Sequence, residues 1–447
     1  NAEVNYNYIE YNNSQGWFDH GIYARDSEVR GDTIIWMLGS TSFGRGIYGD
    51  RLQVVDNYIN ALGGDWNGYL VQVNQNNELG DYKILGNTIY AARHQRAIST
   101  QDYTTIENNY LNGQNMGWDH ERTAIEVGNS CRIINNHVVG FRDGISAVSV
   151  NDTEILDNYI EARFHTIYAP DAKGDNIINN NTLKKYTSEG DWFINLTNAS
   201  SVSVKNNICE GLGGAGFYFN NTILDMSHNL IVTPGVGVEI SNQVQGSVLN
   251  NTIISTNNGD YGLTVSNQSF PSIRNNIIQG YTTGMYLEND FINNNVSHNG
   301  FWDISGDVYS GNAIADQMGE LITYNNNSDV SDIYGNIYMD PMFVNQDSSD
   351  YNLIDSSPYI NAGSPSYTDV DGSISDIGAF YFDSPAYQDS ITNVSVVNLN
   401  ITGNVLLNEN DSDNKQDIRI IDFGRSIPKE DQIKLNRIEK EEFCKEA

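Results

Sequence analysis

The chain has 447 residues, with 24 Lys and Arg against 57 Asp and Glu, and a formal net charge of −33 at pH 7. A protein this acidic lacks the basic surface that DNA, RNA and anionic membranes require, which argues against all three as general partners. No segment is long and apolar enough to cross a bilayer as a helix, so we expect no membrane insertion. The three cysteines lie far apart, which argues against a disulfide framework or a zinc site.

A short phrase recurs along the chain: a polar residue, then Asn, then two apolar or aromatic positions, as in Asp56-Asn57-Tyr58-Ile59. Most copies follow one another after 22 to 27 residues, so the chain is a repeat protein. Weaker copies fall at Asn7 and Asp32. The clear copies are marked by Asn57, Asn87, Asn109, Asn136, Asn158, Asn181, Asn207, Asn229, Asn251, Asn276 and Asn295.

Each repeat carries short β-rich runs, such as residues 52–55 and 124–127, separated by Gly, Asn, Asp and Ser turns, and none has a helical half. Alternating runs can turn one face inward, and stacking the repeats buries that face. The Asn column then bonds the coils above and below, and Asn tolerates the left-handed backbone that such turns need. We therefore predict an all-β parallel β-helix, a solenoid of about 11 to 13 coils.

One long domain is expected over residues 1–382, with an irregular end segment from about 300 to 382. Residues 383–447 are predicted to be a β-like extension followed by a charged tail, partly helical or disordered.

The rhythm breaks past residue 300, where Asp340-Pro341-Met342-Phe343, Asp350-Tyr351-Asn352-Leu353 and Asp376-Ile377-Gly378-Ala379-Phe380 follow one another. With the Asn repeats, this succession resembles secreted bacterial right-handed parallel β-helix proteins, the pectin-lyase-like superfamily, over residues 1–382. The resemblance implies a bacterial protein that is secreted or held at the cell surface. That superfamily contains polysaccharide lyases, glycoside hydrolases, epimerases, phage tailspikes and adhesins, so the chemistry stays open.

Six coils align on one strand, which begins at Gly21-Ile22, Gly46-Ile47, Ala97-Ile98, Ala124-Ile125, Gly144-Ile145 and Thr166-Ile167. Just before these strands, a ridge of Arg, His and carboxylate residues runs over four consecutive coils between residues 93 and 165, and then stops. Arg forks bind sugar carboxylates or sulfates bidentately. The ridge therefore predicts a groove for an acidic polysaccharide.

The leading prediction is a lyase that cleaves a uronate-containing polysaccharide by β-elimination. His120 or His165 would be the base, because the unperturbed pKa of His lies near neutrality, and Arg side chains would hold the uronate carboxylate. The catalytic candidates are His120, His165, Arg122, Arg142, Glu121 and Asp143. The substrate-binding candidates are Arg93, His94, Arg96, Asp119, Glu126, Arg163, Tyr168, Trp118 and Trp192.

Other functions remain open. A glycoside hydrolase of an acidic or sulfated glycan would use two of the carboxylates Asp119, Glu121, Glu126 and Asp143. Uronate epimerisation shares the same groove. A non-catalytic adhesin, tailspike-like or surface structural module would only bind. Tailspikes usually trimerise, so a stable trimer would favour that reading, and a monomer is expected here. The ridge could also be a ladder of Arg–carboxylate pairs that ties the turns together without a ligand.

The segment Asp369-Val370-Asp371-Gly372-Ser373-Ile374-Ser375-Asp376 resembles part of a calcium loop. Carboxylates at alternate positions can wrap a hard cation, which makes Asp369, Asp371 and Asp376 candidate metal ligands. The segment lacks the closing Glu of a full loop, and a plain turn is the alternative reading. No cofactor other than calcium is expected.

Overall fold

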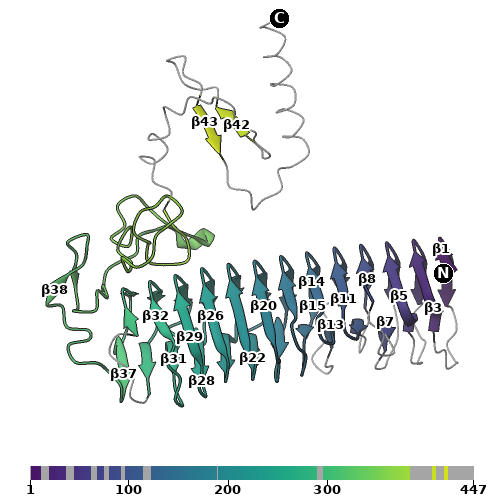
Figure 1. Cartoon of the computed structure of the whole chain (residues 1–447), viewed down its shortest axis with the longest axis horizontal. Coiled ribbons are helices and arrows are strands. Elements are labelled where there is room, and N and C mark those ends of the chain that lie inside the picture. Colours follow the sequence, from purple (N-terminus) through teal and green to yellow (C-terminus); the bar gives the residue numbers. More distant parts are fainter. Residues whose placement is uncertain are drawn as a thin grey trace, which may run out of the picture. The chain divides into compact units, whose positions relative to one another are not determined.

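A computed structural model of the chain describes residues 2–11, 20–36, 45–61, 68–74, 80–91, 96–113, 122–188, 190–288, 295–382, 405–408 and 417–420. Its contacts divide the chain into two units, Asn1–Phe382 and Asp383–Ala447. In the first unit, successive coils stack their strands in parallel, from the purple N-terminal strands to the green ones of later coils (Figure 1). The predicted all-β parallel β-helix is confirmed.

Three parallel ladders run along the solenoid. The first ladder consists of β3 (His20–Arg30), β5 (Arg45–Val55), β7 (Tyr69–Asn74), β10 (Arg96–Thr100), β13 (Thr123–Glu126), β16 (Asp143–Ser146), β19 (Ile167–Ala169), β22 (Trp192–Thr197), β25 (Ala215–Asn220), β28 (Val238–Ser241), β31 (Tyr261–Val265), β34 (Thr283–Leu287) and β37 (Tyr309–Gly311). β3 and β5 are long enough to enter the second ladder as well.

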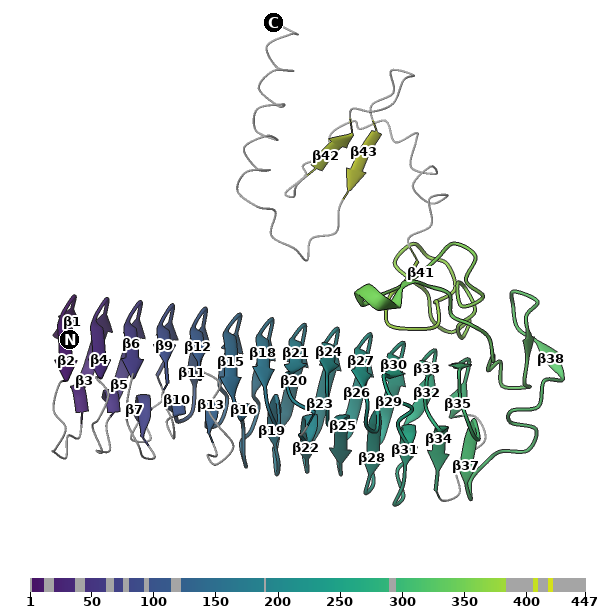
Figure 2. The same ribbon diagram turned by 180° about the vertical axis from the view of Figure 1, so that it is seen from behind.

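The second ladder consists of β1 (Ala2–Asn5), the C-terminal halves of β3 and β5, β8 (Tyr82–Leu85), β11 (Thr104–Glu107), β14 (Arg132–Ile134), β17 (Glu154–Leu156), β20 (Asp175–Asn179), β23 (Ser201–Lys205), β26 (Ile223–Ser227), β29 (Gln245–Leu249), β32 (Ser272–Arg274) and β35 (Val296–Ser297). The third ladder, labelled along the solenoid in Figure 2, consists of β2 (Tyr8–Tyr11), β4 (Thr33–Trp36), β6 (Tyr58–Ala61), β9 (Thr88–Tyr90), β12 (Tyr110–Asn112), β15 (His137–Phe141), β18 (Tyr159–Ala162), β21 (Thr182–Lys185), β24 (Ile208–Gly211), β27 (Leu230–Thr233), β30 (Thr252–Ser255), β33 (Ile277–Gln279) and β36 (Gly300–Trp302).

The interior is a stack of aliphatic side chains from equal positions in successive coils. Ile98 pairs with Val71 in the preceding coil and with Ile125 in the following one, and all three are fully buried. Ile145 and Ile167 continue the row. The alignment that located the predicted ridge is therefore correct, and outward side chains at equal positions lie about 4.8 Å apart along the solenoid.

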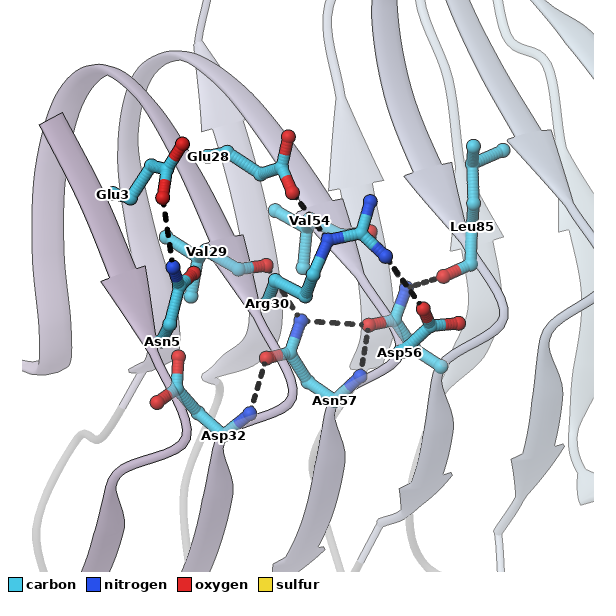
Figure 3. Close-up of polar contacts among 11 residues, drawn as sticks. Glu3, Asn5, Glu28, Val29, Arg30, Asp32, Val54, Asp56, Asn57 and Leu85 are labelled. Atoms are coloured by element: carbon cyan, nitrogen blue, oxygen red, sulfur yellow. Dashed lines mark hydrogen bonds and ion pairs between the residues drawn. The ribbon is translucent and has the colours of Figure 1, made fainter. Parts of the chain in front are cut away.

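A column of buried asparagines ties neighbouring coils together at the turn between the second and third ladders. The backbone N–H and side-chain amide of Asn57 both donate to the side-chain oxygen of Asn87, at 3.0 and 2.9 Å. The same amide donates to the carbonyl of Val29 at 3.0 Å, while the side-chain oxygen of Asn57 accepts the N–H of Asp32 at 2.9 Å (Figure 3). Each rung thus satisfies backbone groups that the turn would otherwise bury unpaired.

The residue directly before each Asn of the column adopts the left-handed backbone conformation. Asp56, Asn108, Asn135, Asp157 and Asn180, each directly before a rung, have φ between 51° and 59°. Asn and Asp adopt this conformation at the lowest cost after Gly, which explains the paired polar residues of the repeat phrase. The first polar residue makes the turn, and the second joins the coils.

The column of asparagines departs from the prediction at its C-terminal end. The rung after Asn276 is Asn299 instead of Asn295, since Asn299 accepts the N–H and amide of Asn276 at 3.0 Å each. Asn336 and then Asp332 finish the column. The error arose because residues 289–299 contain several Asn in a row, and only the fold decides which of them reaches the ladder.

The irregular end segment packs on the outer side of the third ladder. Tyr351 contacts Leu230, Val232 and Ile254, and a second apolar cluster joins Ile277 to residues 337–377. The N–H of Ala379 donates to Thr252 Oγ1 at 2.9 Å. The motifs that carried the family resemblance therefore cover an apolar stripe of the late coils.

The second unit is described only at β42 (Val405–Asn408) and β43 (Asp417–Ile420), which pair antiparallel. Apart from β43, the predicted charged tail lies outside the described residues. Among the described residues, no helix is long and apolar enough to cross a membrane.

Replacing a rung of the ladder is expected to be costly. The side chain of Asn181 takes part in five hydrogen bonds. Asn181→Ala should lower the free energy of unfolding in urea by at least about 2 kcal/mol, because it leaves buried groups without partners. The control is Asn180→Gly at the exposed left-handed position beside it, which should be nearly neutral. Equal effects of the two variants would contradict this role of the ladder.

One position of the asparagine column holds Asp instead of Asn, and replacing it by Asn is expected to increase the stability of the fold. Asp32 is fully buried, and its Oδ2, which stands where other rungs carry the amide donor, has no hydrogen-bond partner. Asp32→Asn supplies that donor and should raise the free energy of unfolding by about 1 to 3 kcal/mol. A lower midpoint in thermal or urea unfolding would contradict this expectation.

Candidate functional site

The described part of the predicted ridge forms a hydrogen-bonded network on the outer face of the first ladder. His165, which precedes β19, lies between two aspartates. Its Nδ1 is 3.0 Å from Asp143 Oδ1, which also accepts the His165 backbone N–H at 3.1 Å. Its Nε2 is 3.4 Å from Asp191 Oδ2, within ion-pair distance but without hydrogen-bond geometry. The imidazole is therefore oriented by Asp143 and covered by Asp191.

Aromatic and cationic side chains surround this imidazole. The Tyr168 ring lies 4.6 Å from it, and Phe164 lies 5.2 Å away. Arg142 places its guanidinium 4.4 Å over the Phe164 ring and donates to Asp143 Oδ2 at 3.0 Å. Because the side chain of His165 is only 10% exposed whereas that of Asp191 is 44% exposed, Asp191 is the part of the pair that solvent or a ligand meets first.

The electrostatics follow from this geometry. Burial alone would lower the pKa of His165, but the hydrogen bond with Asp143 and the nearby Asp191 outweigh it and raise the pKa above its usual value. His165 in turn lowers the pKa of Asp191 and keeps that carboxylate ionised. Both carboxylates therefore favour the protonated form of the imidazole.

A buried lysine lies beneath the network. Lys185, at the end of β21, donates to the backbone carbonyl of Asp191, and its ammonium lies 4.6 Å from the centre of the Phe193 ring. Burial lowers the pKa of Lys185 to about 7. The ammonium braces the turn that presents Asp191.

A second network spans the three coils that directly precede those of the first network. Arg96 donates to the Tyr69 hydroxyl at 2.9 Å, and that hydroxyl donates to Glu126 Oε2 at 2.8 Å. Burial and the hydrogen bond to Glu126 raise the pKa of Tyr69. These contacts are of the kind expected if the ridge were a ladder of Arg–carboxylate pairs without a ligand, with a tyrosine between the two charged groups.

The structure therefore brings together some of the predicted site residues. Arg142, Asp143, His165 and Tyr168 share one network, with Trp192 directly after Asp191, whereas Arg96 and Glu126 belong to the other. Arg122 is buried, at 6% exposure, and Arg163 is partly exposed. Outside the described residues lie Arg93, His94, Trp118, Asp119, His120 and Glu121.

Sequence reasoning missed Asp191, Tyr69, Lys185 and Tyr218. Tyr218 lies in the coil after Trp192, with ring centroids 5.5 Å apart. The sequence did contain a signal for Asp191. It lies directly before Trp192, and in the alignment of the coils Asp191 occupies the same place as Arg142 two coils earlier. Nothing in the sequence marked Lys185, because it comes from the third ladder and reaches the site only through the fold.

The candidate calcium loop uses its carboxylates on backbone groups. Asp369 accepts the N–H of Asp376 at 2.9 Å, Asp376 accepts those of Asn361 and Phe382, and Asp371 accepts that of Ser373. Burial raises the pKa of Asp376 to about 6. Within the described ranges, no group of three or more His, Cys, Asp or Glu is arranged to hold a metal ion. Calcium binding by Asp369, Asp371 and Asp376 stays a prediction.

Comparison with known proteins agrees with the fold. The family model described as the right-handed β-helix region matches residues 123–278 and, overlapping them, 193–336. This chain is thus a right-handed parallel β-helix protein, which confirms the resemblance inferred from its sequence, with no subfamily identified. No curated protein matches the sequence.

A crystal structure of PfbA, a surface adhesin of Streptococcus pneumoniae, is similar at 12% sequence identity with a TM-score of 0.31, over 68% of this chain and 77% of that one. A likeness at this level carries no functional inference.

The His165 network predicts a pH-dependent contribution to stability. Because its folded-state pKa is raised, His165 stabilises the fold fully below its unfolded pKa of about 6.5, and this contribution is lost as pH rises through the higher folded value. The melting temperature of His165→Gln should therefore fall furthest below that of the wild type near pH 5.5. The gap should narrow by pH 9. A gap that is constant, or that widens with pH, would contradict the assignment.

Proposed function

We propose that this protein binds an acidic polysaccharide on the outer face of the first ladder and cleaves it by β-elimination beside a uronate carboxylate. The observation that carries the proposal is the imidazole of His165, oriented by Asp143 and flanked by Arg142 and by aromatic rings on a continuous sheet face. A secreted or cell-surface location belongs to the same proposal, because such polymers are extracellular.

Binding would use the outward side chains of successive coils. Tyr168, Trp192 and Tyr218 offer flat apolar surfaces to sugar rings, and Arg142 and Arg96 offer guanidinium donors to carboxylates. The side chains of these two arginines are 31% and 32% exposed. In a chain with a net charge of −33, this is a surface where an anion could be held.

The proton-transfer step would use His165 as the base. Asp143 holds Nδ1, which leaves Nε2 to take the proton beside the uronate carboxylate, and Arg142 would neutralise that carboxylate. Asp191 covers Nε2 in the free protein, so its carboxylate must move aside when substrate binds. His120, the other candidate base, lies outside the described residues.

Glycoside hydrolysis is the second candidate, favoured by the placement of Asp143 and Asp191 on opposite sides of one imidazole. Hydrolases place a pair of carboxyl groups about the scissile bond. The low pKa of Asp191 suits a nucleophile or base, and not the general acid that hydrolysis also requires.

The test is incubation of the purified protein with alginate, pectate, chondroitin, heparin, ulvan and carrageenans, with and without calcium, following ultraviolet absorbance and reducing ends. A lyase raises both signals, and a hydrolase raises reducing ends alone. For the active substrate, His165→Gln should lower kcat by about 10² to 10⁴-fold, whereas Arg142→Ala should mainly raise KM. Arg132→Ala, on the second ladder and paired with Glu154, is the matched control and should leave both constants unchanged.

Reducing ends without ultraviolet absorbance would replace elimination with hydrolysis. Binding to the polymers without any product would leave an adhesin or structural module. Full activity of His165→Gln would remove His165 from the mechanism.

A further inference from the structure

The outer face of the first ladder continues past the His165 network with a different set of side chains. In the coils that contain β22, β25, β28, β31 and β34, two partly exposed side chains per coil lie in separate rows along the solenoid. The first row continues the one that contains His165, and it consists of Trp192, Ala215, Val236, Tyr261 and Thr283. The other row consists of Asn195, Tyr218, Glu239, Thr264 and Tyr286.

Two aromatic pairs mark the ends of this surface. Trp192 and Tyr218 have ring centroids 5.5 Å apart, and Tyr261 and Tyr286 have centroids 5.7 Å apart. The residues between them in the first row, Ala215 and Val236, have short side chains. Aromatic rings therefore lie at both ends of a stretch in which the side chains of the first row are short.

Glu239 lies in that stretch, directly between Tyr218 and Thr264 in the register of the ladder. It is partly buried, and burial is the only cause that raises the pKa of its carboxyl group. The described residues offer it no hydrogen bond or ion pair, unlike Asp143, Asp191 and Glu126 on the same face. A half-buried carboxylate without donors is costly to maintain, and a ligand that brings donors removes that cost.

We propose that Glu239 and Tyr218 form a binding subsite for an uncharged sugar residue, whose hydroxyl groups donate to the Glu239 carboxylate while its ring lies against the tyrosine. The subsite deepens the proposed function and rests on it for the polysaccharide. A uronate is disfavoured at this position because two carboxylates repel each other. An uncharged sugar combines the hydroxyl donors and the apolar ring face that this pair of side chains matches.

The position fits one extended ligand that also reaches the His165 network. Ile167, Ile194, Phe217 and Val238 occupy equal places in consecutive coils, so the coil of Glu239 follows that of His165 by three. Three coils correspond to roughly 14 Å along the solenoid. The bound polymer would therefore contain uncharged sugar residues in addition to uronates.

The experiment is calorimetric titration of the intact protein with hexasaccharides of glucose, mannose, xylose and galactose, alongside oligouronates and oligoglucosamine. At least one neutral hexasaccharide should bind, and Glu239→Ala should weaken that binding about tenfold or more. Glu239→Gln, which keeps the shape of the side chain, should recover part of the loss. Glu154→Ala, at a partly exposed glutamate of the second ladder, should bind as the wild type does.

A pH series adds a readout that a purely structural role would not move. Wild-type affinity for the neutral sugar should rise as pH rises through the titration of Glu239, because the ionised carboxylate is the stronger acceptor. In Glu239→Gln, this rise should be absent. If no neutral hexasaccharide binds, if Glu239→Ala leaves affinity unchanged, or if oligoglucosamine is preferred, the inference is wrong.

These outcomes separate the two proposals. Glu239-dependent binding without polymer cleavage would remove the lyase and keep the subsite. Uronate cleavage, with no effect of the Glu239 substitutions on the binding of neutral sugars, would keep the lyase and remove the subsite.

Discussion

The asparagine ladder is the interaction on which this solenoid depends. A coil must turn sharply between the second and third ladders, and each turn buries backbone groups that no strand can pair. The side chain of one Asn per coil satisfies groups in its own coil and in both neighbours, as the five side-chain hydrogen bonds of Asn181 illustrate. Because every rung serves the next coil, the ladder fixes the register of all three sheets. The regular spacing of side chains on the outer face of the first ladder follows from this register.

That register determines what the outer face can do. Side chains at equal places in successive coils stand at the strand spacing, so a surface suited to an extended polymer arises from repetition alone. Chemistry enters where the repetition is broken. Asp143 and His165 occupy equal places in neighbouring coils, and Asp191 lies one residue before that place in the next coil. Three different polar groups therefore meet there and raise the pKa of the imidazole, which identical residues could not do. Further along, Glu239 lies between Tyr218 and Thr264 in the register of the ladder, without a hydrogen-bond or ion-pair partner among the described residues.

The proposed reaction and the proposed sugar subsite place different demands on this face. Around His165, cations and carboxylates nearly balance, which suits the carboxylate of a uronate. Around Glu239, an unpartnered carboxylate favours hydroxyl donors over anions. A polymer that contains both charged and uncharged sugars would meet both demands in a single binding mode, with the buried Lys185 bracing the turn at the boundary between them.

The sequence by itself determined the repeat, the parallel β-helix, the rungs from Asn57 to Asn276, and the row that contains Asp143 and His165. These follow from periodicity and turn chemistry, which act between residues of neighbouring repeats. It did not determine that Asn299 instead of Asn295 continues the ladder, or that Asp191 closes over His165. Nor did it show that Lys185 arrives from another ladder, or that residues 337–382 cover the late coils. Only the tertiary structure decided these, because each depends on which side chains meet in space, and the repeat phrase does not specify that.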